Sequence, residues 1–368
     1  MSLLALIFAN TADACAPELT RARAMASVPF GGRYHMIDFT LSAMINAGIT
    51  TIGIATRDHY LPLSEHLGSG RDWDLHRRDG GLVLLPPNCG ENTQTRLQAL
   101  SGSLPFLQSR NEEHIILADS NIITAIDISE MFTTHQKTGA DITTTYAQTE
   151  YTEDACGQNV IIDMDAQSRV TALGCYGRRL GRHNLGLNIW LMKREYLIHL
   201  INHAIARGHT SFTRQALAPR LGEIRVFGYS YNGYCARISS LCSYYRAHME
   251  LLNAENRRAL LQAEGKPVYT RVRNSPATKY TAGAVAGNSL IADGCVIEGE
   301  VQGSVLFRGV RVGRGAVVRN SVIMPHSYIA PDAALECVVA DRGVVAREGA
   351  RLCGREDYPF YIAQGAMV

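Results

Sequence analysis

Short runs of apolar and β-branched residues alternate with amphipathic segments over roughly the first 250 residues of the chain. The runs are Leu3–Phe8, Thr51–Ala55, His114–Ala118 and Asp141–Tyr146. Such short, nearly continuous runs are typical of strands that are buried on both faces of a parallel sheet. The segments Leu41–Ala47 and Ile128–Lys137 between them have helical spacing. This order predicts an α/β domain with a doubly wound sheet.

A different repeat begins near Gly287. A small apolar residue followed by Ala or Gly returns roughly every 16 to 21 residues, close to three hexapeptides. The apolar positions are Ile291, Val312, Ile329 and Val345. Val312, Val318 and Met324 also keep a step of six residues, which ordinary hairpins with glycine turns would not hold. The pattern therefore predicts a triangular parallel β-helix.

These two patterns divide the chain into three parts. We expect an α/β domain over residues 1–253, a linker over residues 254–286 and a β-helix over residues 287–368. Lys266–Thr281 supports the linker, because it is irregular and contains Pro, Arg and Tyr.

Composition narrows the classes of function. The net charge of +2 gives no electrostatic reason to expect nucleic acid or a membrane surface as a partner. The apolar start of the chain has no basic flank and reads as a buried strand, not as a signal peptide. No apolar run reaches the roughly 18 residues of a membrane span. The nine cysteines are scattered and form no CxxC pair, which predicts reduced thiols in a cytoplasm and no zinc site.

Two long stretches resemble one family. Arg23–Phe39 reads RAMASVPFGGRYHMIDF, and Leu63–Leu75 reads LSEHLGSGRDWDL. Both resemble glucose-1-phosphate adenylyltransferases, and so does the order of an α/β domain, a linker and a hexapeptide β-helix. The resemblance implies a Rossmann-like nucleotidyltransferase domain of the GT-A type followed by a left-handed parallel β-helix.

The residues that this family uses for catalysis are largely replaced. Ala9–Thr20, ANTADACAPELT, aligns with the family's glycine-rich phosphate loop AGGxGTRLxPLT, yet contains no glycine. Every position therefore carries a Cβ or a ring that blocks close approach of a triphosphate. Cys15 takes the place of the loop arginine, and Met25 takes the place of a lysine near the phosphates.

The resemblance also locates the two carboxylates that bind Mg²⁺ in the family. Ser120 replaces the first, with Asp119 one residue early, and Arg237 replaces the second. Arginine cannot ligate Mg²⁺. The family's sugar-phosphate lysine has no clear counterpart, although Arg178 or Arg179 could hold a phosphate. We therefore expect no catalytic residues and no cofactor in this chain, and Mg²⁺ only in a catalytic partner.

A chain of this kind is expected to act through contacts and ligand sensing. The resemblance implies an allosteric regulatory subunit of ADP-glucose synthesis for glycogen. Its partner would be a catalytic subunit in a hetero-oligomer such as a heterotetramer, although the chain alone could form a homo-oligomer. Arg33, Arg271 and Arg273 are candidates for binding a small anionic effector. Taken singly, each of them is better interpreted as a solvated surface charge, and only the set points to an anion site.

Alternatives remain open at this point. The first is an active transferase that uses relocated groups, for example Asp119 and Asp127. The second is a hexapeptide acyltransferase with His326 as base, which would leave the first 250 or so residues unexplained. Asp38 lies in an apolar run and needs a buried partner, either Arg33 or a helix N-terminus. Its role is more often structural than ligand-binding.

Overall fold

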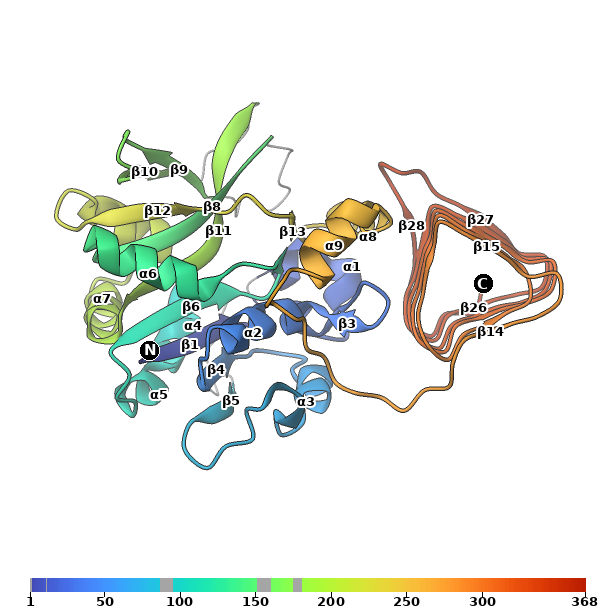
Figure 1. The fold of residues 1–368 in the computed structure, drawn as a ribbon, viewed down its shortest axis with the longest axis horizontal. Helices are drawn as coiled ribbons and strands as arrows, with labels where there is room; N and C mark the ends of the chain where they lie inside the picture. The colour runs from blue at the N-terminus through green and yellow to red at the C-terminus, as the bar shows by residue number, and fades with distance from the viewer. Residues whose placement is uncertain (1, 11, 87–94, 151–159, 175–180) are drawn as a thin grey trace.

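The computed structural model describes residues 2–10, 12–86, 95–150, 160–174 and 181–368. An α/β domain comes first, and a three-sided β-helix holds the C-terminus (Figure 1). Both predicted parts of the fold are confirmed.

The α/β domain is built on a nine-stranded sheet. Its central strands lie in the order β6-β1-β4-β5 and are mutually parallel. The strand bounds are β1 Leu3–Phe8, β4 Thr51–Ala55, β5 Gly81–Leu85, β6 His114–Asp119, β8 Ile142–Glu150, β9 Ile161–Met164, β10 Val170–Gly174, β11 Arg182–Lys193 and β12 Val226–Ser230. β11 runs antiparallel to both β6 and β8, so the sheet is parallel only in part. Antiparallel strands need no helical crossover between them. The alternation of apolar runs and helices in the sequence therefore could not show that β11 is antiparallel.

Helices cover both faces of this sheet. Their bounds are α1 Pro17–Thr20, α2 Met36–Asn46, α3 Leu61–Leu67, α4 Arg96–Gly102, α5 Leu104–Gln108, α6 Ile128–Thr138, α7 Arg194–Ala206, α8 Leu241–Glu250 and α9 Ala254–Leu261. Short 3₁₀ turns are η1 Asp13–Cys15, η2 Met25–Ser27, η3 Arg71–Trp73 and η5 Ala218–Arg220, and η4 Phe212–Leu217 is a π-type turn. Two-stranded pairs are β2 Pro29–Phe30 with β3 Tyr34–His35, and β7 Ile122–Thr124 with β13 Cys235–Arg237.

β1 shows why a continuous apolar run suits this position. Leu4, Leu6 and Phe8 pack in the core under α4, α5 and α7. The alternate residues Leu3, Ala5 and Ile7 pack with α2, α3 and α6 on the opposite face. Because both faces are covered, each residue of the strand must be apolar.

The β-helix has three faces, each a five-stranded parallel sheet. The first contains β14 Lys279–Tyr280, β17 Val296–Ile297, β20 Arg311–Val312, β23 Tyr328–Ile329 and β26 Val345–Ala346. The second contains β15 Val285–Gly287, β18 Glu300–Gln302, β21 Val317–Arg319, β24 Ala334–Glu336 and β27 Arg351–Cys353. The third contains β16 Leu290–Ile291, β19 Val305–Leu306, β22 Val322–Ile323, β25 Val338–Ala340 and β28 Phe360–Ile362.

The register between coils follows the apolar period. Val312 pairs with Ile329, and Ile329 pairs with Ala346. β14 and β15 already belong to these sheets, although the sequence placed residues 254–286 in a linker. Tyr280 and Val285 are exposed in this first coil, so it lacks the inward aliphatic pattern that marks the later coils.

The third face of the β-helix packs against the α/β domain. Val305, Phe307 and Val322 share a buried cluster with Phe30 and Tyr244. The Tyr244 hydroxyl donates a hydrogen bond to the Pro29 carbonyl at 2.6 Å, and the Tyr245 hydroxyl donates one to the Asn320 carbonyl at 2.7 Å. These two tyrosines and Trp73 are buried and serve packing. The two parts of the chain are joined by a hydrophobic interface.

Candidate functional site

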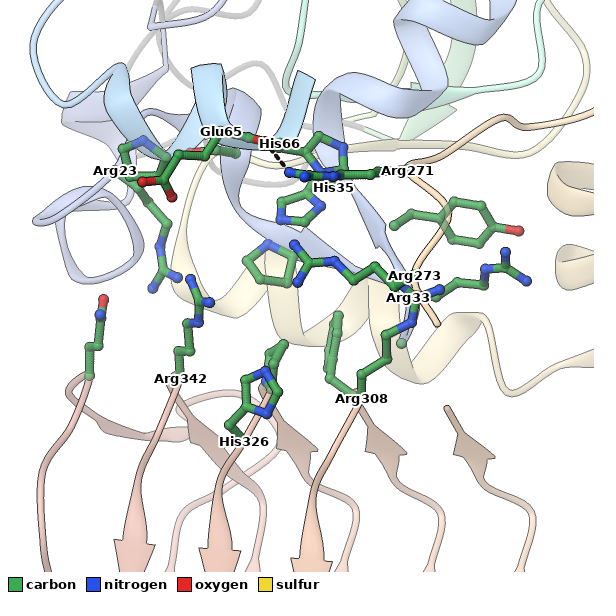
Figure 2. Close-up of a pocket in the computed structure, with 18 of the residues that line it drawn as sticks. Arg23, Arg33, His35, Glu65, His66, Arg271, Arg273, Arg308, His326 and Arg342 are labelled. Carbon is green, nitrogen blue, oxygen red and sulfur yellow. Dashed lines mark hydrogen bonds between the residues drawn. The ribbon is translucent and has the colours of Figure 1, made fainter. Parts of the chain in front are cut away.

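A cavity of about 640 Å³ lies between the α/β domain and the β-helix (Figure 2). Six arginines line it, and they come from five separate stretches of the chain. They are Arg23, Arg33, Arg271, Arg273, Arg308 and Arg342. The fold thus brings together the three arginines proposed from the sequence and adds three more.

The position of each arginine follows from the local fold. Arg33 lies in the turn between β2 and β3, where Gly31 and Gly32 adopt positive φ angles of 60° and 87°. Arg271 and Arg273 lie in the extended segment between α9 and the β-helix. Arg308 and Arg342 occupy corresponding turns of coils that lie two apart in the β-helix. Aligning the repeats by their turn residues, in place of their apolar residues, would have identified Arg308 and Arg342 from the sequence.

Some of these cations already have protein partners. Arg23 forms a buried ion pair with Asp341, and Arg308 Nε lies 2.9 Å from Asp293 Oδ1. Arg271 donates a hydrogen bond to the carbonyl of Glu65. Within the described parts of the chain, the guanidinium groups of Arg273 and Arg342 donate no hydrogen bond. They therefore have free donors at the cavity.

The electrostatics of the cavity favour an anion. Partial burial, followed by the charges of Arg271, Arg308 and Arg342, lowers the pKa of Arg273 below its usual value. Like charges placed this close repel one another, and a bound polyanion would relieve that repulsion. Guanidinium groups also match phosphate and sulfate oxygens in pairs. Arg33, Arg273 and Arg342 are exposed, so their side chains are accessible to a ligand from solvent.

Two histidines line one wall of the cavity, and a buried carboxylate is bonded to them. His66 Nε2 lies 2.6 Å from Asp38 Oδ1, and the rings of His35 and His66 lie 3.7 Å apart. Asp38 is fully buried in the first turn of α2 and accepts a hydrogen bond from the His35 amide. Its role is structural, as expected. Its partners are a helix N-terminus and His66, with no bond to Arg33.

By distance alone, this cluster could hold a metal ion. One ligand atom from each of His35, Asp38 and His66 lies within 4.8 Å of the others. However, both oxygens of Asp38 are already used, and the surrounding cavity carries six guanidinium groups. Repulsion from those cations opposes a divalent ion. The electrostatics therefore favour an anion in the cavity beside His35 and His66 over a metal ion bound between His35, Asp38 and His66.

The stretch that aligns with the family's phosphate loop is folded onto itself. Asp13 Oδ1 accepts a hydrogen bond from the Met25 amide at 2.8 Å, and Asp13 Oδ2 accepts one from Asn10 Nδ2 at 2.6 Å. Burial raises the pKa of Asp13 to about 6, against the lowering effect of these hydrogen bonds. Cys15 and Met25 are buried in the interface cluster. Neither side chain can therefore act on a phosphate from its present position.

Asp119 is engaged in a buried network. It forms an ion pair with Arg96 at the start of α4, and Asn188 Nδ2 donates a hydrogen bond to Asp119 Oδ2 at 2.8 Å. Ser120 lies beside it, with its hydroxyl 3.4 Å from the Ala9 carbonyl. Arg96 and Asn188 could not be assigned to this carboxylate from sequence, because the contact depends on tertiary packing.

Arg237 and Asp127 are also occupied elsewhere. Arg237 donates a hydrogen bond from Nη2 to the Gly186 carbonyl. Asp127 caps α6 by accepting from the Glu130 amide at 3.0 Å, and it lies 3.4 Å from Lys266 Nζ. Among the described residues, the positions aligned with the family's metal carboxylates hold Ser120 and Arg237, which do not fit Mg²⁺. The relocated pair of Asp119 and Asp127 gains no support from these contacts.

Two further predictions concern other positions. Arg178 and Arg179 lie outside the described residues. His326 lies in the β-helix wall of the cavity, and partial burial together with Arg342 and Arg273 lowers its pKa.

None of the described helices is long and apolar enough to cross a membrane.

Comparison with known proteins agrees with this architecture. A nucleotidyl transferase family model matches residues 17–173, and a GlmU-like C-terminal hexapeptide model matches residues 276–357. The chain is thus a nucleotidyltransferase-type protein with a hexapeptide β-helix, the left-handed architecture that the sequence predicted.

Full-length relatives narrow the family. A glucose-1-phosphate adenylyltransferase of Bacillus cytotoxicus is 31% identical over 358 residues, covering 94% of this chain and 93% of that protein. The glycogen biosynthesis protein GlgD of Bacillus subtilis is 29% identical over 366 residues, covering 99% and 96%. A glucose-1-phosphate adenylyltransferase of Clostridium perfringens is 29% identical over 334 residues, covering 89% and 84%. The chain belongs to the glucose-1-phosphate adenylyltransferase family.

Proposed function

We propose that this chain is a regulatory subunit of glucose-1-phosphate adenylyltransferase in ADP-glucose synthesis for glycogen. It would be inactive or nearly so by itself and would modulate a catalytic homologue. The observation that carries the proposal is the replacement of the second metal carboxylate by Arg237, which is bonded to the Gly186 carbonyl. That replacement reverses the charge at a position where a cation would have to bind.

The other aligned positions support the same conclusion. Asp119 is neutralised by Arg96 and is therefore not free to hold a metal ion. The glycine-free stretch before Met25 places the buried carboxyl group of Asp13 where a polyphosphate would lie. Adenylyl transfer depends on stabilising negative charge that develops on phosphate, so these changes act against the transition state.

The cavity supports the regulatory half of the proposal. Its arginines come from both the α/β domain and the β-helix, so a bound anion would contact both parts at once. Such a ligand would favour one relative placement of the two parts, and a catalytic subunit packed against them would respond to that placement. Thermodynamic linkage requires that effector binding and subunit assembly change each other by the same factor.

The first test measures pyrophosphate release from ATP and glucose 1-phosphate with Mg²⁺ present. The purified chain alone should release none above background. Sustained turnover by the chain alone would overturn the proposed inactivity, and its loss in an Asp119→Asn variant that circular dichroism shows to be folded would then point to relocated catalytic groups.

The second test adds a catalytic glucose-1-phosphate adenylyltransferase. We expect the two chains to co-elute and the mixture to show a changed response to anionic effectors. The matched variant Arg273→Met should still co-elute but change that response less. Failure to co-elute with any catalytic homologue, together with unchanged activity, would contradict the regulatory role.

A further inference from the structure

The closely spaced, tilted imidazole rings of His35 and His66 are unusual neighbours for a set of arginines. Their ring centroids lie 3.7 Å apart, and both residues line the cavity. His66 is held by Asp38, whose second oxygen accepts the His35 amide. His66 Nδ1 is buried and has no hydrogen-bond partner among the described residues. The pair therefore has capacity to bind a proton and to donate to a ligand.

We propose that an anion enters this cavity together with a proton that the His35–His66 pair takes up. The inference rests on the proposed anion site and deepens it by naming how the site selects its ligand. It predicts that a dianion such as a phosphate or sulfate group binds more tightly as the pH falls.

Cations from several surrounding segments disfavour a positive charge on His35 while the cavity lacks an anion. They are Arg23 after α1, Arg33 beside β3, Arg271 and Arg273 between α9 and the β-helix, and Arg308 and Arg342 on the β-helix, while the titratable His326 faces the same cavity. Among the described residues, negative charge comes from Asp38 behind the pair, from Glu65 on the cavity wall, and from Asp341 and Asp293, which are paired with Arg23 and Arg308. Burial first, and then His66, Arg273, Arg23 and Arg342, lower the pKa of His35 well below its ordinary value.

A bound dianion would reverse part of this effect. It would offset the field of the arginines, and it would accept a hydrogen bond from a charged imidazole. The pair then binds a proton more readily with the anion than without it, so anion and proton bind cooperatively. Because the rings are in contact, the proton belongs to the pair and not to one residue.

The test uses sulfate, which stays doubly charged across the range from about pH 5.5 to 8. A phosphate group has its own ionisation at about pH 6 and would confuse the result. Isothermal titration at constant ionic strength should show sulfate affinity rising as pH falls, by up to about tenfold per pH unit for one proton. Titrations in two buffers of different ionisation enthalpy should show uptake of up to about one proton per sulfate.

His35→Asn is the informative variant. His35 is the N-cap residue of α2, and asparagine is a favoured N-cap, so the helix should form. This variant should still bind sulfate through the arginines, but with a flatter pH profile and less proton uptake. The exposed His76 lies outside the cavity, so His76→Asn should keep the wild-type profile.

Three outcomes would overturn the inference. A pH-independent sulfate affinity in the wild-type chain would remove the proton coupling and leave the anion site standing. A pH dependence of sulfate affinity that persists in His35→Asn but disappears in His326→Asn would place the proton on His326, on the β-helix wall. Absence of sulfate binding at every pH would remove the anion site as well. Proton counting on the wild-type chain decides the question even if a variant fails to fold.

Discussion

Arg23 of the α/β domain forms a buried ion pair with Asp341 of the β-helix, 318 residues later in the chain. Arg23 Nε also donates to the Leu19 carbonyl at 3.0 Å, at the end of the glycine-free stretch. The Tyr361 hydroxyl lies 2.6 Å from Asp341 Oδ2 and 2.7 Å from the Glu18 carbonyl. The β-helix is therefore bonded to the segment that aligns with the family's phosphate loop.

Breaking this pair should destabilise the chain strongly. Asp341→Asn leaves the Arg23 charge buried without its carboxylate, which typically costs about 3 to 5 kcal/mol. Arg23→Met together with Asp341→Asn should cost less than the sum of the single changes. Chemical denaturation followed by tryptophan fluorescence measures this, because Trp73 and Trp190 are both buried in the α/β domain.

An exposed pair provides the control for that measurement. Arg319 and Glu300 lie 2.9 Å apart on the β-helix, with side-chain exposures of 52% and 36%. Glu300→Gln should change the free energy of unfolding by at most about 1 kcal/mol. Equal costs for Glu300→Gln and Asp341→Asn would show that the Arg23–Asp341 pair does not join the two parts energetically.

Asp13 should make stability depend on pH in the opposite sense to an ordinary surface carboxylate. Its pKa is raised from 3.8 to about 6 in the folded chain, so the folded state binds more protons between these values. The contribution of the protonated Asp13 carboxyl group to the free energy of unfolding is fully present below about pH 4 and is lost as the pH rises through about 6. Asp13→Asn avoids that loss and should gain up to about 3 kcal/mol relative to wild type above pH 6.

The measurement for Asp13 compares unfolding free energies from about pH 4 to 8. The difference between Asp13→Asn and wild type should grow across this range. Asp58 is exposed nearby, and Asp58→Asn should give a flat difference. A flat difference for Asp13→Asn as well would mean that its carboxyl group is not desolvated.

The sequence predicted most of the architecture because apolar periodicity reports burial directly. β1 and β4 have the predicted bounds, and the predicted helix at Ile128 becomes α6. The antiparallel β11 was not predicted, since an apolar strand carries no mark of its direction. The first coil of the β-helix was missed because Tyr280 and Val285 face solvent.

The candidate site was predictable only in part. Arg33, Arg271 and Arg273 were found from family position and residue type, and the fold places all three at one cavity. Arg308 and Arg342 were missed, because they become neighbours only when the coils stack. His35 was missed for a related reason: its contact with His66 joins α2 and α3 through tertiary packing.

Asp119 should prove to be a structural residue. Asp119→Asn removes the partner of Arg96, whose side chain is only 12% exposed, and should cost about 3 to 5 kcal/mol of stability. Arg96→Met combined with Asp119→Asn should recover part of that loss, since it removes the unpaired charge. Urea denaturation of the wild type and of these two variants gives the free energies of unfolding. A neutral Asp119→Asn would instead leave Asp119 available for another role.

Arg273 and Arg342, whose guanidinium groups donate no hydrogen bond within the described parts of the chain, should control the response to anions. Replacing both Arg273 and Arg342 by methionine keeps the length of each stem and removes two charges. The double variant should be more stable than wild type at low ionic strength without a polyanion, because like charges repel less. It should also lose most of the stabilisation that sulfate gives to wild type.

Thermal unfolding at constant ionic strength, with chloride exchanged for sulfate, measures both effects. Wild type should gain about 2.7 kcal/mol when sulfate reaches about 100 times its dissociation constant. Arg347 is exposed on the β-helix away from the cavity, so Arg347→Met should respond to sulfate as wild type does. If Arg347→Met and the double variant lose stabilisation equally, sulfate acts through the general charge of the surface and the cavity is not its site.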